Sequence, residues 1–220
     1  RFQRRLNRFA ALIEVSGRVE MVHIANSGRL GELLIPDYDM WLTPVPGSHR
    51  KCFYDLTLVD TGSTLVSLDS RLPNFLFEEA FEAGILTDFN DFQSMKKEVP
   101  YGESRLDILL HSLTGDCFVE TKSVTLVENS VARFPDAPTA RGVKHLNHLS
   151  DAKSNGYDAA IVFIIQRCDA ISLQFDGRSD PEFVLALRRS AKNGVKVLAY
   201  GCHITNSKIS LSLSIPVDLY

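Results

Sequence analysis

The stretches Ser104-Arg-Leu-Asp-Ile-Leu-Leu110 and Cys117-Phe-Val-Glu-Thr-Lys-Ser123 decide what kind of domain this chain forms. Both runs are apolar enough to be strands of a sheet, and yet they contain Asp107, Glu120 and Lys122. A buried charge costs free energy unless it is paired or binds a metal. Two carboxylates and a lysine inside strands therefore indicate either a chemical centre or an internal ion pair.

The register of the two strands determines whether these charges meet. Glu120 and Lys122 are two positions apart and so share a face of a strand. A two-residue loop between the strands would place Asp107 opposite Lys122, and a four-residue loop, 112–115, would place it opposite Glu120. A three-residue loop would place Asp107 opposite Thr121 and separate the groups. We expect the three charges to converge if the loop holds two or four residues.

Convergent carboxylates provide the hard oxygen ligands that Mg²⁺ or Mn²⁺ prefers. A lysine beside them can orient a water nucleophile or neutralise charge on a phosphate. Asp107, Glu120 and Lys122 together form a set suited to metal-assisted phosphodiester hydrolysis. The structural alternative is an ion pair between Lys122 and one carboxylate that only holds the sheet together.

Composition restricts the class of protein. The chain has 220 residues, of which 45% are hydrophobic and 23% charged, with a net charge of −3. These values are typical of a globular protein and do not favour nucleic acid through bulk charge, so such a partner needs a local basic patch. The four cysteines are widely spaced without a Cys/His cluster, which argues against zinc and fits a cytoplasmic setting. The longest apolar run, 159–165, is too short to cross a membrane.

Two domains are expected, 1–68 and 69–220. In the first, short strands separated by turns predict an OB-like β-barrel; the strands are expected at 12–15, 19–24, 40–45 and 53–59. In the second, helices alternate with strands, which predicts an α/β (α+β) mixed sheet flanked by helices. The helices are expected at 72–84, 139–155 and 181–193, and the further strands at 159–165, 195–200 and 209–213.

Basic residues form two candidate nucleic-acid surfaces. Arg4 and Arg5 belong to a basic run at the start of the chain, and Arg50-Lys51 falls in an expected barrel loop. In the second domain Arg141, Lys144 and His148 have the spacing of one helix face, with His145 near its edge. Such groups could neutralise phosphates, although solvated surface positions would show the same patterns.

The wider pattern resembles a known family. Asp107 followed by Glu120-x-Lys122, after a helix bearing Glu79, looks like the PD-(D/E)XK nuclease core. Further motifs, in order along nearly the whole chain, resemble the sugar fermentation stimulation protein A family. They are Arg4-Arg5, Asn26-x-Gly28, Leu72-Pro73-Asn74, Tyr101-Gly102, Ser104-Arg105-x-Asp107, Val119-Glu120-x-Lys122, Phe134-Pro135-Asp136-Ala137, Arg141-Gly142-x-Lys144-His145-Leu146 and Gln166-Arg167.

The resemblance implies an OB-like domain joined to a PD-(D/E)XK nuclease-like domain that binds DNA and affects sugar-utilisation genes, with no organic cofactor. It implies Asp107 and Glu120 as metal ligands, Lys122 as the catalytic-type lysine and Glu79 as an auxiliary acid. Arg141 and Lys144 would face phosphates. The chain departs from the family at Ser123, where Asn is expected, and at Leu68-Asp69-Ser70 and Ser27-Gly28-Arg29-Leu30. Two functions follow: a metal-dependent deoxyribonuclease, or a DNA-binding regulator that keeps the nuclease fold without cutting.

Overall fold

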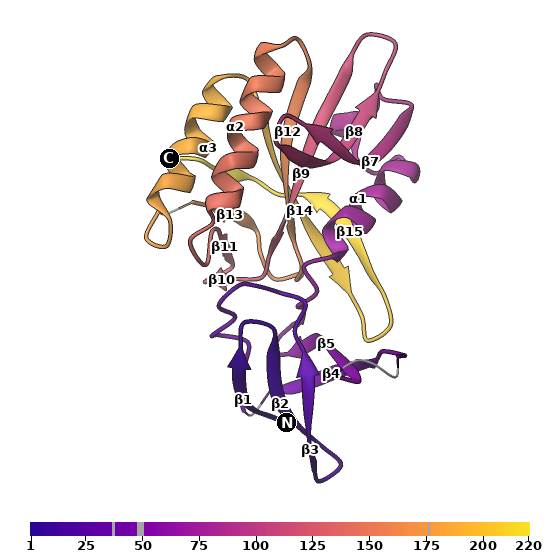
Figure 1. Cartoon of the computed structure of the whole chain (residues 1–220), viewed down its shortest axis with the longest axis vertical. Coiled ribbons are helices and arrows are strands. Elements are labelled where there is room, and N and C mark those ends of the chain that lie inside the picture. The colour runs from indigo at the N-terminus through magenta and orange to yellow at the C-terminus, as the bar shows by residue number, and fades with distance from the viewer. Residues whose placement is uncertain (37, 48–50, 176) are drawn as a thin grey trace.

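The chain folds into a small β-rich domain and a larger domain that carries the helices, at the lower and upper ends of Figure 1. A computed structural model describes residues 1–36, 38–47, 51–175 and 177–220. The helices are α1 (Leu72–Glu82), α2 (Ala140–Ser154) and α3 (Pro181–Lys192), with a 3₁₀ turn at Thr87–Phe89. All three predicted helices are confirmed. Within the described residues, none of them is long and apolar enough to span a membrane.

The first domain is a sheet of order β1-β2-β3-β5-β4, with β6 paired to β5. Its buried core includes Ile13, Val22 and Leu56, which come from three different strands. The four predicted strands are confirmed, but the edge strand β1 was not predicted because Phe2 is its only buried residue. The bounds are β1 (Phe2–Asn7), β2 (Ala10–Val15), β3 (Arg18–His23), β4 (Asp39–Pro44), β5 (Tyr54–Asp60) and β6 (Leu65–Ser67).

The second domain is built on a six-stranded mixed sheet of order β15-β14-β12-β9-β8-β7, in which β9, β12 and β14 are parallel. Their bounds are β7 (Ser94–Tyr101), β8 (Ser104–His111), β9 (Asp116–Val124), β12 (Asp158–Ile165), β14 (Lys196–Ile204) and β15 (Ile209–Ser214). A smaller sheet joins β10 (Val127–Glu128), β11 (Val131–Arg133), β13 (Ser172–Gln174) and β16 (Val217–Asp218). Strand β7 was not predicted, because Lys96, Lys97 and Pro100 are typical of an edge strand.

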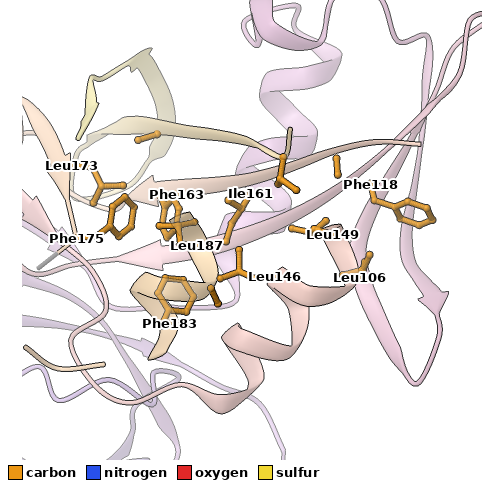
Figure 2. Close-up of a cluster of buried hydrophobic side chains, with 14 of the residues drawn as sticks. Leu106, Phe118, Leu146, Leu149, Ile161, Phe163, Leu173, Phe175, Phe183 and Leu187 are labelled. Atoms are coloured by element: carbon orange, nitrogen blue, oxygen red, sulfur yellow. The ribbon is translucent and has the colours of Figure 1, made fainter. Parts of the chain in front are cut away.

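Helices cover both faces of the large sheet. Leu146 and Leu149 of α2 and Phe183 of α3 pack with Phe163 of β12 in one buried cluster, shown in Figure 2. On the other face, α1 packs through residues such as Phe77 against β8, β9 and β14. Strand β9 is therefore central, and residues on its two faces contact different helices.

The hairpin register is the four-residue alternative. Pairing between β8 and β9 runs from His111 opposite Asp116 to Ile108 opposite Val119, which leaves residues 112–115 as the loop. This is one of the two registers expected to bring the charges together. The pairing of β8 with β9 ends at Ile108, and the two strands begin to separate at Asp107.

Gln166, at the end of β12, joins the two domains. Its side-chain amide donates to the Ser67 hydroxyl (2.8 Å) and to the Asp69 carbonyl (3.1 Å). Its carbonyl oxygen accepts from the Ser123 hydroxyl at 2.6 Å. Ser123 therefore makes a polar contact at one of the three positions where the chain departs from the family pattern. At a second, Asp69 binds the Arg71 guanidinium through both carboxylate oxygens.

Candidate functional site

A cavity of about 390 Å³ lies between the two domains and contains the three charges predicted to act together. Asp107 comes from β8, and Glu120 and Lys122 come from the carboxyl-terminal half of β9. The first domain contributes Arg8 and residues 26–28. In an open sheet with parallel strands, the carboxyl ends of those strands are the usual place for a ligand.

Glu120 is buried, and its two carboxylate oxygens differ in their contacts. Oε1 contacts both Lys122 Nζ and His145 Nδ1. Oε2 is buried and has no hydrogen-bond partner within the described residues. Because buried polar atoms are nearly always satisfied, an orphaned carboxylate oxygen suggests a missing ligand.

His145 is held in one tautomer by its neighbours. It is buried on α2, and Arg141, one helical turn earlier, donates from Nε to His145 Nε2 at 3.3 Å. A guanidinium has only donors, so Nε2 must accept. The proton of the neutral ring therefore lies on Nδ1, from which it is donated to Glu120 Oε1. Arg141 and His145 thus fix which oxygen of Glu120 remains available.

Asp107 approaches the site from the separated end of β8. Its Oδ2 accepts a hydrogen bond from the Thr121 backbone N–H (2.9 Å) and lies 3.1 Å from the Thr121 hydroxyl. That hydroxyl also contacts Asn74 of α1. Asp107 therefore reaches the cavity beside Thr121, on the α1 side of β9, whereas Glu120 contacts His145 of α2. Asp107 and Glu120 still line the same cavity, but they do so where β8 and β9 separate and not as a directly paired couple on one face of the sheet.

The two carboxyl groups have pKa values shifted in opposite directions. Burial and the nearby charge of Glu120 raise the pKa of Asp107 above its ordinary value. Burial also acts to raise the pKa of Glu120, but the Lys122 ammonium and the hydrogen bond from His145 outweigh it and lower that pKa. Glu120 is thus ionised at neutral pH, whereas ionisation of Asp107 is opposed, a cost that a bound cation would relieve.

The available oxygens fit a small divalent cation. Glu120 Oε2 is unpartnered; both Thr121 contacts of Asp107 are made by Oδ2, and Asp107 also has a side-chain hydrogen bond with Asn74. Within the described residues, no group of three or more His, Cys, Asp or Glu side chains is arranged to hold a metal. Two carboxylates still suffice for Mg²⁺, which is commonly held by one or two carboxylates with waters and substrate phosphates.

Glu79 is not in the site. It is exposed on α1 and does not line the cavity, in contrast to Asn74. The auxiliary acid expected on this helix is therefore replaced by an amide. The physical reason is helix phase: Asn74 lies near the beginning of α1 beside Thr121, and Glu79 lies five residues later on the exposed side.

Of the basic residues predicted on α2, the structure places one at the cavity and one away from it. Arg141 lines the cavity, whereas Lys144 is exposed and lies 3.6 Å from Glu103. The expected helix forms, but of the three residues assigned to its basic face only Arg141 lines the cavity. Arg141 lines the cavity and His145, one turn later, contacts Glu120, while α2 buries Leu146 and Leu149 against the sheet.

In the first domain, Arg5 is committed to the backbone. Its guanidinium donates to the carbonyl oxygens of Asn7 (3.1 Å), Arg8 (2.6 Å) and Gly28 (2.9 Å). These bonds hold the loop at 26–29, so Arg5 has a structural role in place of the predicted phosphate contact. Exposed Arg4 and Lys51 do not line the cavity. Arg50 lies outside the described residues.

Sequence reasoning did not assign to the carboxylate site four residues that contact Glu120 or line the cavity, although it placed His145 at the edge of a basic helix face. They are Asn74, His145, Arg71 and Arg133, of which His145 contacts Glu120 and the other three line the cavity. Asn74 and His145 stand inside quoted family motifs, so the motifs themselves were the available indication. Arg71 and Arg133 lie outside those motifs, and only the fold brings them to the cavity that contains Glu120.

Comparisons with known proteins agree with this architecture. Residues 4–68 match the family model "SfsA N-terminal OB domain", and residues 71–208 match "Sugar fermentation stimulation protein RE domain". A sugar fermentation stimulation protein homolog from Moorella thermoacetica is 46% identical over 223 residues, covering 99% of this chain and 95% of the relative. One from Desulforamulus reducens is 42% identical over 218 residues, covering 99% and 91%.

A solved structure is similar over the whole length. The Pyrococcus furiosus SfsA structure in complex with Ca²⁺ has a TM-score of 0.91 and 33% identity, covering 99% of this chain and 94% of that one. The agreement of fold, length and both family models leaves one assignment: the chain belongs to the sugar fermentation stimulation protein family, with an OB domain followed by a nuclease-like mixed α/β domain.

Proposed function

We propose that the chain is a cytoplasmic DNA-binding protein with a divalent-metal phosphodiesterase centre at Asp107, Glu120 and Lys122. The observation that carries this proposal is the buried, unpartnered Oε2 of Glu120 inside an arginine-lined cavity. A purely structural ion pair between Glu120 and Lys122 would leave no buried oxygen without a partner. The Ca²⁺ complex of the Pyrococcus relative adds support for a divalent ion in this family.

The residues of the site have separate roles in this proposal. Asp107 and Glu120 would hold Mg²⁺ or Mn²⁺, which supplies Lewis-acid polarisation of the phosphate and activation of water. Lys122, beside Glu120, places a positive charge where a phosphate oxygen gains negative charge. Arg141 donates toward the phosphate while its Nε stays on His145.

Cleavage assays with matched variants test the proposal. With Mg²⁺ or Mn²⁺, the purified chain is expected to cut DNA, and Glu120→Gln and Lys122→Ala are each expected to lower the rate at least about a hundredfold. Glu79→Gln and Lys144→Ala, which change exposed residues outside the cavity, serve as controls and should cut normally. Intact duplex, single-stranded and branched DNA under both metals would contradict the proposal.

A second candidate is a DNA-binding regulator of sugar-utilisation genes that does not cut. Two observations favour it. The negative charge of Glu120 is already neutralised by Lys122, and the described residues contain no group of three or more side chains arranged to hold a metal. In this case Asp107→Asn should retain DNA at low salt as well as the unaltered chain does. A gel-shift titration against salt measures retention, and no retention at low salt would reject this candidate.

A further inference from the structure

The cavity that contains Glu120 has walls from both domains. Arg8 and the loop at 26–28 come from the first domain, and they face the second-domain residues that surround Glu120. A ligand that fills this cavity therefore contacts both domains.

Contacts between the domains hold these walls in place. The Arg29 backbone N–H donates to Asp136 Oδ2 at 3.0 Å. The same oxygen would lie only 2.4 Å from a Cβ placed on Gly28, so these two segments approach as closely as glycine allows. Gln166 adds buried hydrogen bonds nearby, to Ser67 and Asp69. Widening the cavity would require these contacts to break.

The size of the cavity suits one strand of nucleic acid. Its volume of about 390 Å³ falls at the small end of the ~300–1,000 Å³ range of ligand pockets, which is enough for a nucleotide. In duplex DNA the second strand follows the first across grooves of roughly 6 and 12 Å. One strand fills a cavity of this volume, and a second strand at groove distance would lie outside it.

Positive charge comes from both walls. Arg8 lies on the first domain, and Arg71, Arg133 and Arg141 lie on the second. Each of the second-domain guanidiniums is anchored at one part, which reduces the entropy lost on binding an anion. Arg71 is anchored at Nε and Nη2 by Asp69, and Arg141 at Nε by His145. Within the described residues no hydrogen bond or ion pair engages Nη1 of Arg71, and that group remains available to a phosphate.

We infer that the cavity is a binding site for single-stranded DNA, whose backbone passes between the two domains to reach Glu120. Arg8 and Ser27 contact the strand from the OB domain, and Arg133 and Arg141 contact it from the other side. This inference rests on the proposed function and adds its substrate class. Phosphate contacts supply the affinity, so binding weakens with salt and depends little on sequence.

Fluorescence anisotropy with the whole chain and Ca²⁺ tests the inference, using a labelled single strand and a blunt duplex of the same sequence. We expect the single strand to bind at least about tenfold more tightly. Arg8→Ala should weaken single-strand binding about tenfold, the effect of one charge-assisted hydrogen bond, and reduce the salt slope by about 0.7. Ser27→Glu should weaken it similarly, because an added carboxylate in the cavity repels phosphate.

Matched controls lie outside the cavity. Arg4→Ala removes an exposed arginine from the same domain, and Ser63→Glu adds the same charge in an exposed turn; both should bind as the unaltered chain does. Equal or tighter binding of the duplex, or equal effects of Arg8→Ala and Arg4→Ala, would overturn the inference. Failure of the proposed nuclease activity is distinguishable from failure of this inference. In that case the cleavage assay shows no cut DNA, but the anisotropy assay still shows the preference for the single strand.

Discussion

The side chain of Glu120 has its two oxygens in different surroundings, and this difference depends on a residue far along the chain. Lys122 shares its strand face, which the spacing of two residues predicts. His145 completes the arrangement by occupying Oε1, and it lies on α2, which packs on the sheet through its buried leucines. The helix pattern did not assign His145 to the site, because a polar residue beside an apolar stripe can face either way.

Removing the His145 ring is expected to weaken metal binding. His145→Ala leaves Lys122 as the only group on Glu120 Oε1 among the described contacts and loosens the carboxylate, so Mn²⁺ affinity should fall by about 10- to 100-fold, the usual effect of losing a group that orients a ligand. His145→Asn should recover much of the affinity, because its amide can donate in place of Nδ1. Calorimetric titration with Mn²⁺ measures the affinity of each variant, with His148→Ala as the control. An unchanged Mn²⁺ affinity in His145→Ala would contradict the orienting role of His145.

At the scale of elements, Asp180 sets the beginnings of two helices. Its Oδ1 accepts from the Phe183 N–H at 3.0 Å and caps α3, and its Oδ2 accepts from the Thr139 N–H at 2.7 Å just before α2. Thr139 in turn caps α2 by accepting from Gly142 N–H. Asp180, directly before Pro181, is the N-cap residue of α3. Its second bond links α3 to the helix that presents Arg141 and could not be predicted from local pattern.

Substitutions at these caps should differ in cost. Thr139→Ala removes one cap and should lower the free energy of unfolding by about 1 kcal/mol. Asp180→Ala removes a cap and a second buried acceptor and should cost about 2–3 kcal/mol. Asp180→Asn, with one acceptor oxygen left, should fall between them. Urea unfolding measures all three, and equal losses for Thr139→Ala and Asp180→Ala would show that the second bond contributes nothing.

At the scale of the whole molecule, the domains are joined by buried polar contacts. Gln166 is fully buried and connects β9, β6 and the linker after it through Ser123, Ser67 and Asp69. Such a network is stable only when every member is satisfied. It also fixes the position of the OB domain relative to Glu120, so the cavity depends on it.

Gln166→Leu tests this connection. The substitution leaves the hydroxyls of Ser67 and Ser123 and the Asp69 carbonyl without their partner, and should lower the free energy of unfolding by about 3 kcal/mol. Gln93→Leu, at an exposed position, is the control and should stay within about 0.5 kcal/mol. Urea unfolding gives both values, and a loss at Gln166 no larger than at Gln93 would refute the role of the network.

The sequence by itself determined the helices, most strands and the common face of Glu120 and Lys122, because hydrophobic periodicity, caps and strand alternation are local. It left two hairpin registers open, and it could not show that Arg5 is bound to the loop at Gly28. Only the tertiary structure brought His145 to Glu120, excluded Glu79 and formed the cavity between the domains. Those results depend on contacts between residues distant in sequence, which the packing of whole elements decides.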